Sequence, residues 1–244
     1  IEHLLSALAA LGIDNLTIEL DGAEIPIMDG SALPFVEALE NAGIRPLDVP
    51  RDFIVMRRPV RIQQGASWAE LLPDLGRRIT VSIDFAAQAI GTQTMSVDIT
   101  PSVYRQEIAP ARTFGFAEQL EQLRRHGLAR GSSIKNAILV RDGRVANLEG
   151  LRFRDEFVRH KVLDVIGDLA LAGAPIIGHY RGNRPGHQLN TDLVTLLMDD
   201  PDAWARVRGD RLAEALEGEV EEHESAHRAG GIRPQHEDAR PTPR

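Results

Sequence analysis

The chain has 244 residues, of which 43% are hydrophobic and 26% charged, the balance of an ordinary globular protein with one large or two modest domains. It contains no cysteine, which excludes disulfides, thiolate metal sites and cysteine nucleophiles and leaves histidine and carboxylates as the strong metal ligands. A formal net charge of -8 disfavours a general nucleic-acid binder. The sequence has no signal-peptide pattern and no apolar run near the about 20 residues that a membrane span needs, so we expect a cytoplasmic protein.

The chain opens with an adjacent Glu2-His3 pair. The run from Leu4 to Leu11 predicts a helix that ends at Gly12, and the apolar run from Leu16 to Leu20 predicts a strand after it. Neighbouring side chains on a helix point about 100° apart, so one member of the pair could bind a metal while the other reaches past it. A charged first turn that suits the helix dipole is the alternative interpretation.

The middle of the chain predicts strands followed by helices. Alternating apolar residues are typical of half-buried antiparallel strands, and Asp142-Gly143 fits a hairpin turn. The predicted strands are Phe53 to Arg57, Val60 to Gln63, Ala69 to Leu72, Ile79 to Phe85, Met95 to Ile99, Ala137 to Val140, Arg144 to Ala146 and Ile176 to His179; the predicted helices are Gly115 to Arg125, Asp155 to Leu171 and Leu189 to Met198. From Arg208 onward the acidic composition predicts a short helix and then a disordered tail.

His160, Asp164 and Asp168 follow one another at intervals of four residues within an apolar helical pattern. On a helix they share one face, about 6 Å from neighbour to neighbour. Burying an imidazole and two carboxylates is costly unless they have partners, and a cation is the simplest partner for them. A surface helix whose polar row faces water is the alternative. His187, at a loop-to-helix junction, is well placed for proton transfer, or is a helix cap.

The helix that carries His3 and the helix that carries Asp164 have similar endings. Each residue lies nine positions before a glycine, Gly12 and Gly173, and an apolar strand pattern follows each glycine. The echo predicts two similarly built halves, each offering ligands from an equivalent helix to a site between them.

An ordered set of short motifs resembles one known family. The motifs are Glu2-His3, Ile25 to Ser31, Ala111 to Phe116, Gly150 to Phe153, Asp155 to Lys161, Asp164, Gly167-Asp168 and Gly186-His187. Their order and spacing are similar to those of the UDP-3-O-acyl-N-acetylglucosamine deacetylases, zinc amidases of bacterial lipid A biosynthesis. The resemblance runs from Ile1 to about Trp204.

The resemblance implies an α+β fold of two similarly built domains, layered β-sheets and helices in a β-α-α-β sandwich, with the active site between them. We expect a first domain over residues 1–50, a second over 51–208 with an acyl-chain-binding insert at about 114–140, and an acidic, disordered tail over 209–244. Family members carry a segment before this point, so the first domain is expected to be incomplete at its N-terminal side.

The resemblance also implies the chemistry. The metal ligands are His3, His160 and Asp164, holding Zn²⁺ with one position open for water; iron is the alternative metal. The expected general base is Glu2. His187 is the expected protonated partner, which stabilises the oxyanion or protonates the departing amine, although a single bifunctional Glu2 remains an alternative. Asp168 is expected to hold the His187 ring, and the Thr113 hydroxyl to be a further oxyanion donor.

Substrate binding is assigned to residues beside these groups. Lys161 is expected to reach the diphosphate or the sugar, and Phe114 and Phe116 to stack on a ring and begin the acyl channel, with Ser133 in the insert. A solvated lysine and ordinary core packing of the two phenylalanines are the alternatives. The sequence departs from the family pattern at Gly131 to Lys135, which bears on the insert and not on the zinc chemistry.

Three functions compete at this point. The first is the zinc-dependent deacetylase acting on an acylated UDP-sugar, as a monomer with at most peripheral membrane contact and no nucleic-acid partner. The second is a zinc amidohydrolase for another acylated sugar. The third is a binding protein without turnover. Metal content measured together with deacetylation separates them.

Overall fold

The computed structural model describes residues 1–118 and 134–218. Its helices and helical turns are α1 (Glu2–Leu11), α2 (Leu33–Ala42), α3 (Pro101–Val103), a π-helical turn (Tyr104–Ile108), α5 (Glu156–Leu169), a 3-10 turn (Ala170–Ala172), α6 (His187–Asp199) and a second 3-10 turn (Gly209–Arg211). The strands are β1 (Asp52–Met56), β2 (Val60–Gln64), β3 (Ser67–Leu72), β4 (Arg77–Asp84), β5 (Thr92–Asp98), β6 (Phe114–Phe116), β7 (Ile138–Arg141), β8 (Arg144–Val145), β9 (Ile176–Asn183) and β10 (Trp204–Arg208).

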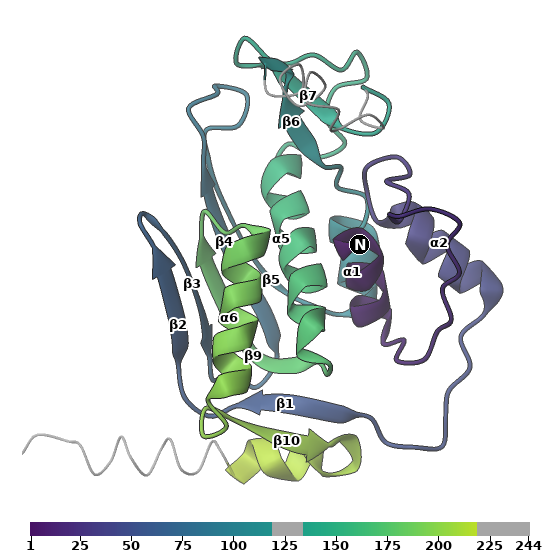
Figure 1. The fold of residues 1–244 in the computed structure, drawn as a ribbon, viewed down its shortest axis with the longest axis vertical. Coiled ribbons are helices and arrows are strands. Elements are labelled where there is room, and N and C mark those ends of the chain that lie inside the picture. The colour runs from purple at the N-terminus through teal and green to yellow at the C-terminus, as the bar shows by residue number, and fades with distance from the viewer. Residues whose placement is uncertain (119–133, 219–244) are drawn as a thin grey trace, which may run out of the picture.

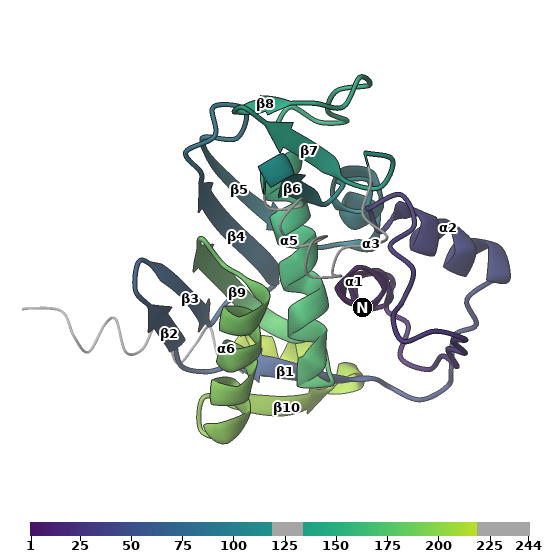
Figure 2. The ribbon, with the colours of Figure 1, turned by 45° about the horizontal axis from the view of Figure 1, so that its top comes forward.

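A mixed α+β architecture packs helices in layers on one main sheet, as expected. β9 is central in this sheet: it runs parallel to β1 and β4 and antiparallel to β3, while β2, β5 and β10 extend the edges. Helices α5 and α6 contact the sheet strands, α1 packs on α5, and α2 packs on α1 (Figure 1). Strands β6, β7 and β8 form a small second sheet at the N-terminal end of α5 (Figure 2).

The strands confirm the alternation predicted from the sequence. Along β4, Ile79, Val81 and Ile83 are buried and their neighbours are more exposed, and β4 pairs with β5 antiparallel. Three of the predicted helices appear as α1, α5 and α6, and the Asp142-Gly143 turn joins β7 to β8. The sequence analysis missed α2 and β10.

One predicted strand is wrong, and one predicted helix begins later than expected. Leu16 to Leu20 forms no strand, and the side chains of Leu16, Ile18 and Leu20 are exposed. An isolated strand leaves its backbone groups without partners, and within the described residues no strand lies beside this segment to supply them. In the helix predicted from Gly115 to Arg125, Gly115 and Phe116 instead lie in β6, whose backbone pairs with β7. Ala117 and Glu118 are helical, and the rest of this prediction falls outside the described residues.

Because Leu16 to Leu20 is not a strand, the predicted similarity between the two halves is supported only by their helices and the glycines that follow them. Gly12 ends α1 at a φ of 75°, and Gly173 follows α5 and its 3-10 turn at a φ of 78°; both are left-handed conformations that favour glycine. Residues 212–218 are helical, and the rest of the predicted tail lies outside the described residues. Among the described helices, none is both long and apolar enough to cross a membrane.

Helix α1 approaches α5 closely at a single glycine. A Cβ atom built on Gly167 would lie 2.2 Å from the backbone oxygen of Glu2. Any larger residue would therefore force the two helices apart, which makes this glycine a condition for the contact between the two segments that carry Glu2, His3, His160 and Asp164.

We expect Gly167→Ala to lower the free energy of unfolding by about 2 kcal/mol or more. Alanine is intrinsically better than glycine in a helix by about 1 kcal/mol, but overpacking costs about 1 to 3 kcal/mol and here meets backbone, which cannot rotate away. Urea unfolding measures the change. Gly22→Ala is the matched control because nothing lies within 4 Å of its Cβ position; equal stability of the two variants would contradict the prediction.

Candidate active site

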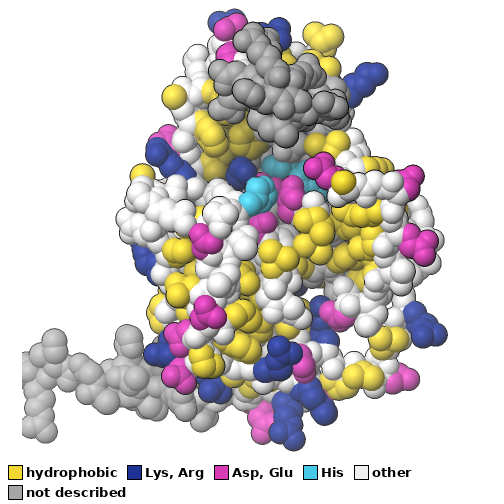
Figure 3. Space-filling model, viewed as in Figure 1, with side chains coloured by type: hydrophobic (Ala, Val, Ile, Leu, Met, Phe, Trp, Pro, Cys, Tyr) yellow, Lys and Arg dark blue, Asp and Glu magenta, His cyan; other side chains and the backbone are white. Residues whose placement is uncertain are grey.

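Three buried ligand atoms converge where the first turn of α1 meets α5. His3 comes from α1, and His160 and Asp164 come from successive turns of α5. One ligand atom from each lies within 4.8 Å of the other two. The two imidazole rings meet edge to face, with centroids 4.9 Å apart. Histidine and acidic side chains lie side by side at the surface in the middle of one face of the molecule (Figure 3).

The orientation of His160 leaves one ring nitrogen for a ligand role. Its Nδ1 lies 3.0 Å from the backbone oxygen of Ala111, and its Nε2 lies 3.3 Å from Oδ1 of Asp164. That Oδ1 is buried and has no hydrogen-bond partner among the described residues. An orphaned carboxylate oxygen beside two imidazoles is costly without a cation, so this donor set fits a divalent metal.

The charges of the three groups suit zinc. Burial, and then the proximity of His160, lower the pKa of His3 to about 4, and burial also lowers the pKa of His160. Burial opposes the charge of Asp164, but His160 and Lys161 outweigh it and hold the pKa of Asp164 at about 2. Near neutral pH the site thus presents two neutral imidazoles and one carboxylate, ligands that Zn²⁺ accepts in catalytic sites.

Glu2 and His187 lie on the more exposed side of this cluster. A carboxylate oxygen of Glu2, one of Asp164 and a ring nitrogen of His187 also lie within 4.8 Å of one another. Oε1 of Glu2 is 3.8 Å from Nε2 of His3, and the Glu2 side chain is 33% exposed. Two groups capable of proton transfer therefore face solvent directly beside the three candidate ligands.

Asp168 holds the ring of His187 from one turn beyond Asp164. Nδ1 of His187 lies 3.0 Å from Oδ1 of Asp168, and this hydrogen bond is the main reason that the pKa of His187 is raised. Asn190 donates to Oδ2 of Asp168 at 2.8 Å, and the hydroxyl of Tyr180 donates to Asn190 at 2.7 Å. Asn190 and Tyr180 were not predicted from the sequence. The position of Asn190, one helical turn after His187, would have indicated that the two side chains lie close together.

Lys161 lies against the carboxylate and an aromatic ring. Its Nζ is 2.7 Å from Oδ2 of Asp164 and 5.7 Å from the ring centroid of Phe114. The negative charge of Asp164 outweighs burial and raises the pKa of Lys161. Phe114 stacks edge to face on Phe157, and Phe116 contacts Phe85 with ring centroids 5.9 Å apart. The two phenylalanines thus pack in an aromatic cluster while both remain half-buried.

The remaining predicted residues are placed as follows. Thr113 follows the Ala111 contact on the same loop, where its backbone N–H donates to Gly30 and its carbonyl accepts from Ile138. Ser133 lies outside the described residues. Within the Ile25 to Ser31 motif, to which no site role was assigned, the carboxylate of Asp29 accepts hydrogen bonds from Ser31 and Arg152.

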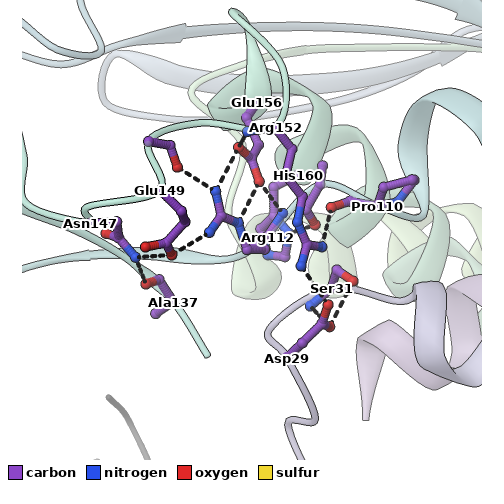
Figure 4. Close-up of polar contacts among 12 residues, drawn as sticks. Asp29, Ser31, Pro110, Arg112, Ala137, Asn147, Glu149, Arg152, Glu156 and His160 are labelled. Carbon is purple, nitrogen blue, oxygen red and sulfur yellow. Dashed lines mark hydrogen bonds and ion pairs between the residues drawn. The ribbon is translucent and has the colours of Figure 1, made fainter. Parts of the chain in front are cut away.

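Sequence reasoning also missed a buried ion pair behind His160. Arg112 donates through Nε to Oε1 of Glu156 at 2.9 Å, and Glu156 is fully buried in the first turn of α5 (Figure 4). Glu156 lies four residues before His160, so it extends the polar row toward the N-terminus of the helix. Extending the four-residue spacing of His160, Asp164 and Asp168 by one interval toward the N-terminus would have identified Glu156.

Comparisons with known proteins agree with this geometry. The family model described as UDP-3-O-acyl N-acetylglycosamine deacetylase matches residues 1–199. A protein of Acidithiobacillus ferrooxidans named UDP-3-O-acyl-N-acetylglucosamine deacetylase is 50% identical over 206 residues, 84% of this chain and 68% of that protein. Proteins with the same name from Phenylobacterium zucineum and Shewanella oneidensis are 48% and 47% identical, each over 88% of this chain and 74% and 71% of their own lengths. The chain belongs to the UDP-3-O-acyl-N-acetylglucosamine deacetylase family.

Proposed function

We propose that the chain is a zinc-dependent hydrolase that removes the N-acetyl group from UDP-3-O-acyl-N-acetylglucosamine, giving UDP-3-O-acyl-glucosamine and acetate in lipid A biosynthesis. Membership of the family supports the reaction and the substrate. The observation that carries the metal assignment is the buried Oδ1 of Asp164, which has no hydrogen-bond partner among the described residues and lies beside His160, with a ring nitrogen of His3 within 4.8 Å.

In this proposal His3, His160 and Asp164 hold the metal. When bound, Zn²⁺ would act as a Lewis acid and lower the pKa of a water molecule toward about 7. Neutral imidazoles are available without a proton to displace, because the pKa values of both histidines are lowered. Lys161 neutralises the second oxygen of Asp164, so the carboxylate is fixed without being protonated.

Glu2 is the proposed general base. Its partly exposed carboxylate adjoins the ligand cluster, where it can take a proton from the water that attacks the acetyl carbon. The C–N bond of the amide then breaks, and the sugar nitrogen needs a proton to leave as an amine. Acetate carries away the oxygen of the water.

His187 is the proposed source of positive charge beside Glu2, on the same exposed side of the ligand cluster. Asp168 raises its pKa, so His187 stays protonated to higher pH than a free histidine and can stabilise the oxyanion or protonate the departing nitrogen. The Thr113 hydroxyl is proposed as a second oxyanion donor. Lys161, Phe114 and Phe116 are proposed to contact the substrate, and Ser133 to contribute from the insert.

The domain division expected above is also a proposal, with the site formed between the helices of residues 1–50 and those of 51–208. We further propose a cytoplasmic monomer that contacts membranes only peripherally. Substrate chemistry supports this: the nucleoside diphosphate is charged and does not cross a bilayer, while the acyl chain is apolar and gains about 0.8 kcal/mol per buried methylene. Light scattering of the purified protein tests the monomer.

We expect Glu2→Gln to lower kcat at least about 100-fold while the protein keeps one equivalent of zinc, because glutamine cannot accept the proton. His160→Ala is the contrasting variant and should lose zinc as well as turnover. Deacetylation of UDP-3-O-acyl-N-acetylglucosamine and elemental analysis measure both. Full turnover by Glu2→Gln would remove the base assignment, and preference for a sugar without the 3-O-acyl group would favour another amidohydrolase.

The alkaline limb of the pH profile is expected to report on His187. Activity that needs the protonated ring is present at low pH and lost as pH rises through the raised pKa, so Asp168→Asn should move the limb to lower pH. The profile of kcat/KM against pH measures it. Asp192→Asn is the control, since Asp192 contacts Gln188 and Gln64 on the outside of α6. An unmoved limb in Asp168→Asn would assign the titration to another group.

A further inference from the structure

One peptide group, between Ala111 and Arg112, is held at both ends by α5. Its carbonyl oxygen lies 3.0 Å from Nδ1 of His160, and its N–H donates to Oε1 of Glu156 at 3.0 Å. No cis peptide occurs among the described residues, so the C=O and N–H of this group point in opposite directions. Glu156 and His160 lie one helical turn apart, and the peptide therefore bridges them alongside the helix (Figure 4).

The carbonyl end of this peptide determines which nitrogen of His160 carries the proton. A carbonyl oxygen can only accept, so the neutral ring must donate from Nδ1. The lone pair then lies on Nε2, the nitrogen nearest to Asp164. If the peptide turned over, its N–H would face Nδ1 instead, and the ring would carry its proton on the nitrogen that points at the ligand cluster.

The N–H end is fixed by the fully buried carboxylate of Glu156, which accepts hydrogen bonds from four N–H groups. Oε1 of Glu156 accepts from the backbone N–H and Nε of Arg112, and Oε2 accepts from Nη2 of Arg112 at 3.2 Å and from the backbone N–H of Arg152 at 2.5 Å. Arg112 is itself buried and also donates to Gly150 and Glu149. The charge of each partner is thus compensated, and neither side chain has room to turn away.

A second arginine holds the loop just before this peptide. Arg152 donates from Nη1 to the carbonyl of Pro110 at 2.8 Å and from Nη2 to Asp29 at 2.8 Å. Asp29 in turn accepts from Ser31. The loop is therefore fixed at successive residues, and its connections reach the segment between α1 and α2.

We propose that Glu156 and Arg112 are positioning residues for the metal centre. By holding the Ala111–Arg112 peptide they keep His160 in the Nδ1-protonated form, with Nε2 free to bind a metal. The part of this inference that concerns metal affinity rests on the proposed function. The part that concerns the tautomer stands on the hydrogen bonds alone and is measurable without metal.

The test combines two readouts on metal-free and metal-loaded protein. Nitrogen-15 NMR of the metal-free protein reports the tautomer of His160, and Co²⁺ or Zn²⁺ titration reports affinity. In Glu156→Gln the amide NH₂ must face a donor whichever way it is turned. We expect a mixed or Nε2-protonated His160 and an affinity loss of about 10- to 100-fold, the usual effect of removing a group that orients a ligand.

Two variants separate positioning from a general effect on Arg112. Glu149→Gln alters a carboxylate, 57% exposed, that contacts the same guanidinium but not the peptide, and should leave tautomer and affinity unchanged. Arg112→Lys keeps the positive charge and the backbone N–H, and should retain the Nδ1 tautomer with a smaller loss of affinity than Glu156→Gln.

Several outcomes would overturn the inference. An Nε2-protonated His160 in the unmodified protein would do so without any variant, as would a folded Glu156→Gln with an unchanged tautomer and unchanged affinity. If Glu156→Gln does not fold, Glu156→Asp is measured instead, because its shorter carboxylate withdraws from the Arg112 N–H; unchanged values in that variant contradict the proposal. Failure of the unmodified protein to bind metal would refute the proposed metal centre, and the tautomer of His160 alone would then decide whether Glu156 positions the ring.

Discussion

The contact between α1 and α5 at Gly167 is the constraint on which the rest of the site depends. The backbone of Glu2 lies so close to Gly167 that a Cβ there would sit 2.2 Å from its carbonyl oxygen. This approach places His3, the next residue, against the ring of His160 on the neighbouring helix. A candidate ligand set drawn from two segments more than 150 residues apart is thereby assembled by backbone packing.

Helix α5 carries four buried ionisable residues at intervals of four: Glu156, His160, Asp164 and Asp168. Each is compensated, Asp164 by a neighbour on α5 itself and the other three by residues outside the helix. Glu156 pairs with Arg112, Asp164 with Lys161 and Asp168 with His187, while His160 is bonded to the Ala111 carbonyl. A buried charge without a partner costs several kcal/mol, so only this set of neighbours allows the helix to be buried. The polar row is consequently the candidate functional face of α5, and three of its four members bring a loop or helix from another segment against it.

The sequence predicted which residues share a face within one helix or strand better than it predicted contacts between elements. Alternation in Ile79, Val81 and Ile83 predicted β4, and the four-residue spacing predicted that His160, Asp164 and Asp168 share a helix face. The strand at Leu16 to Leu20 was predicted from local apolar pattern as well, but a strand also needs a neighbour, which local pattern does not report. The meeting of His3 with His160 followed from resemblance and from the echo of the two helices, not from any local rule.

The residues that the sequence analysis missed are those whose role lies in a partner far along the chain. Arg112 and Glu156 are ordinary charged residues in the sequence; only the fold shows that the Ala111–Arg112 peptide contacts both Glu156 and His160. Spacing still contained part of this information, because Glu156 is one step of four before His160. A buried polar row on a helix should therefore be extended in both directions before it is interpreted, because a terminal member such as Glu156 connects the helix to a loop distant in the sequence.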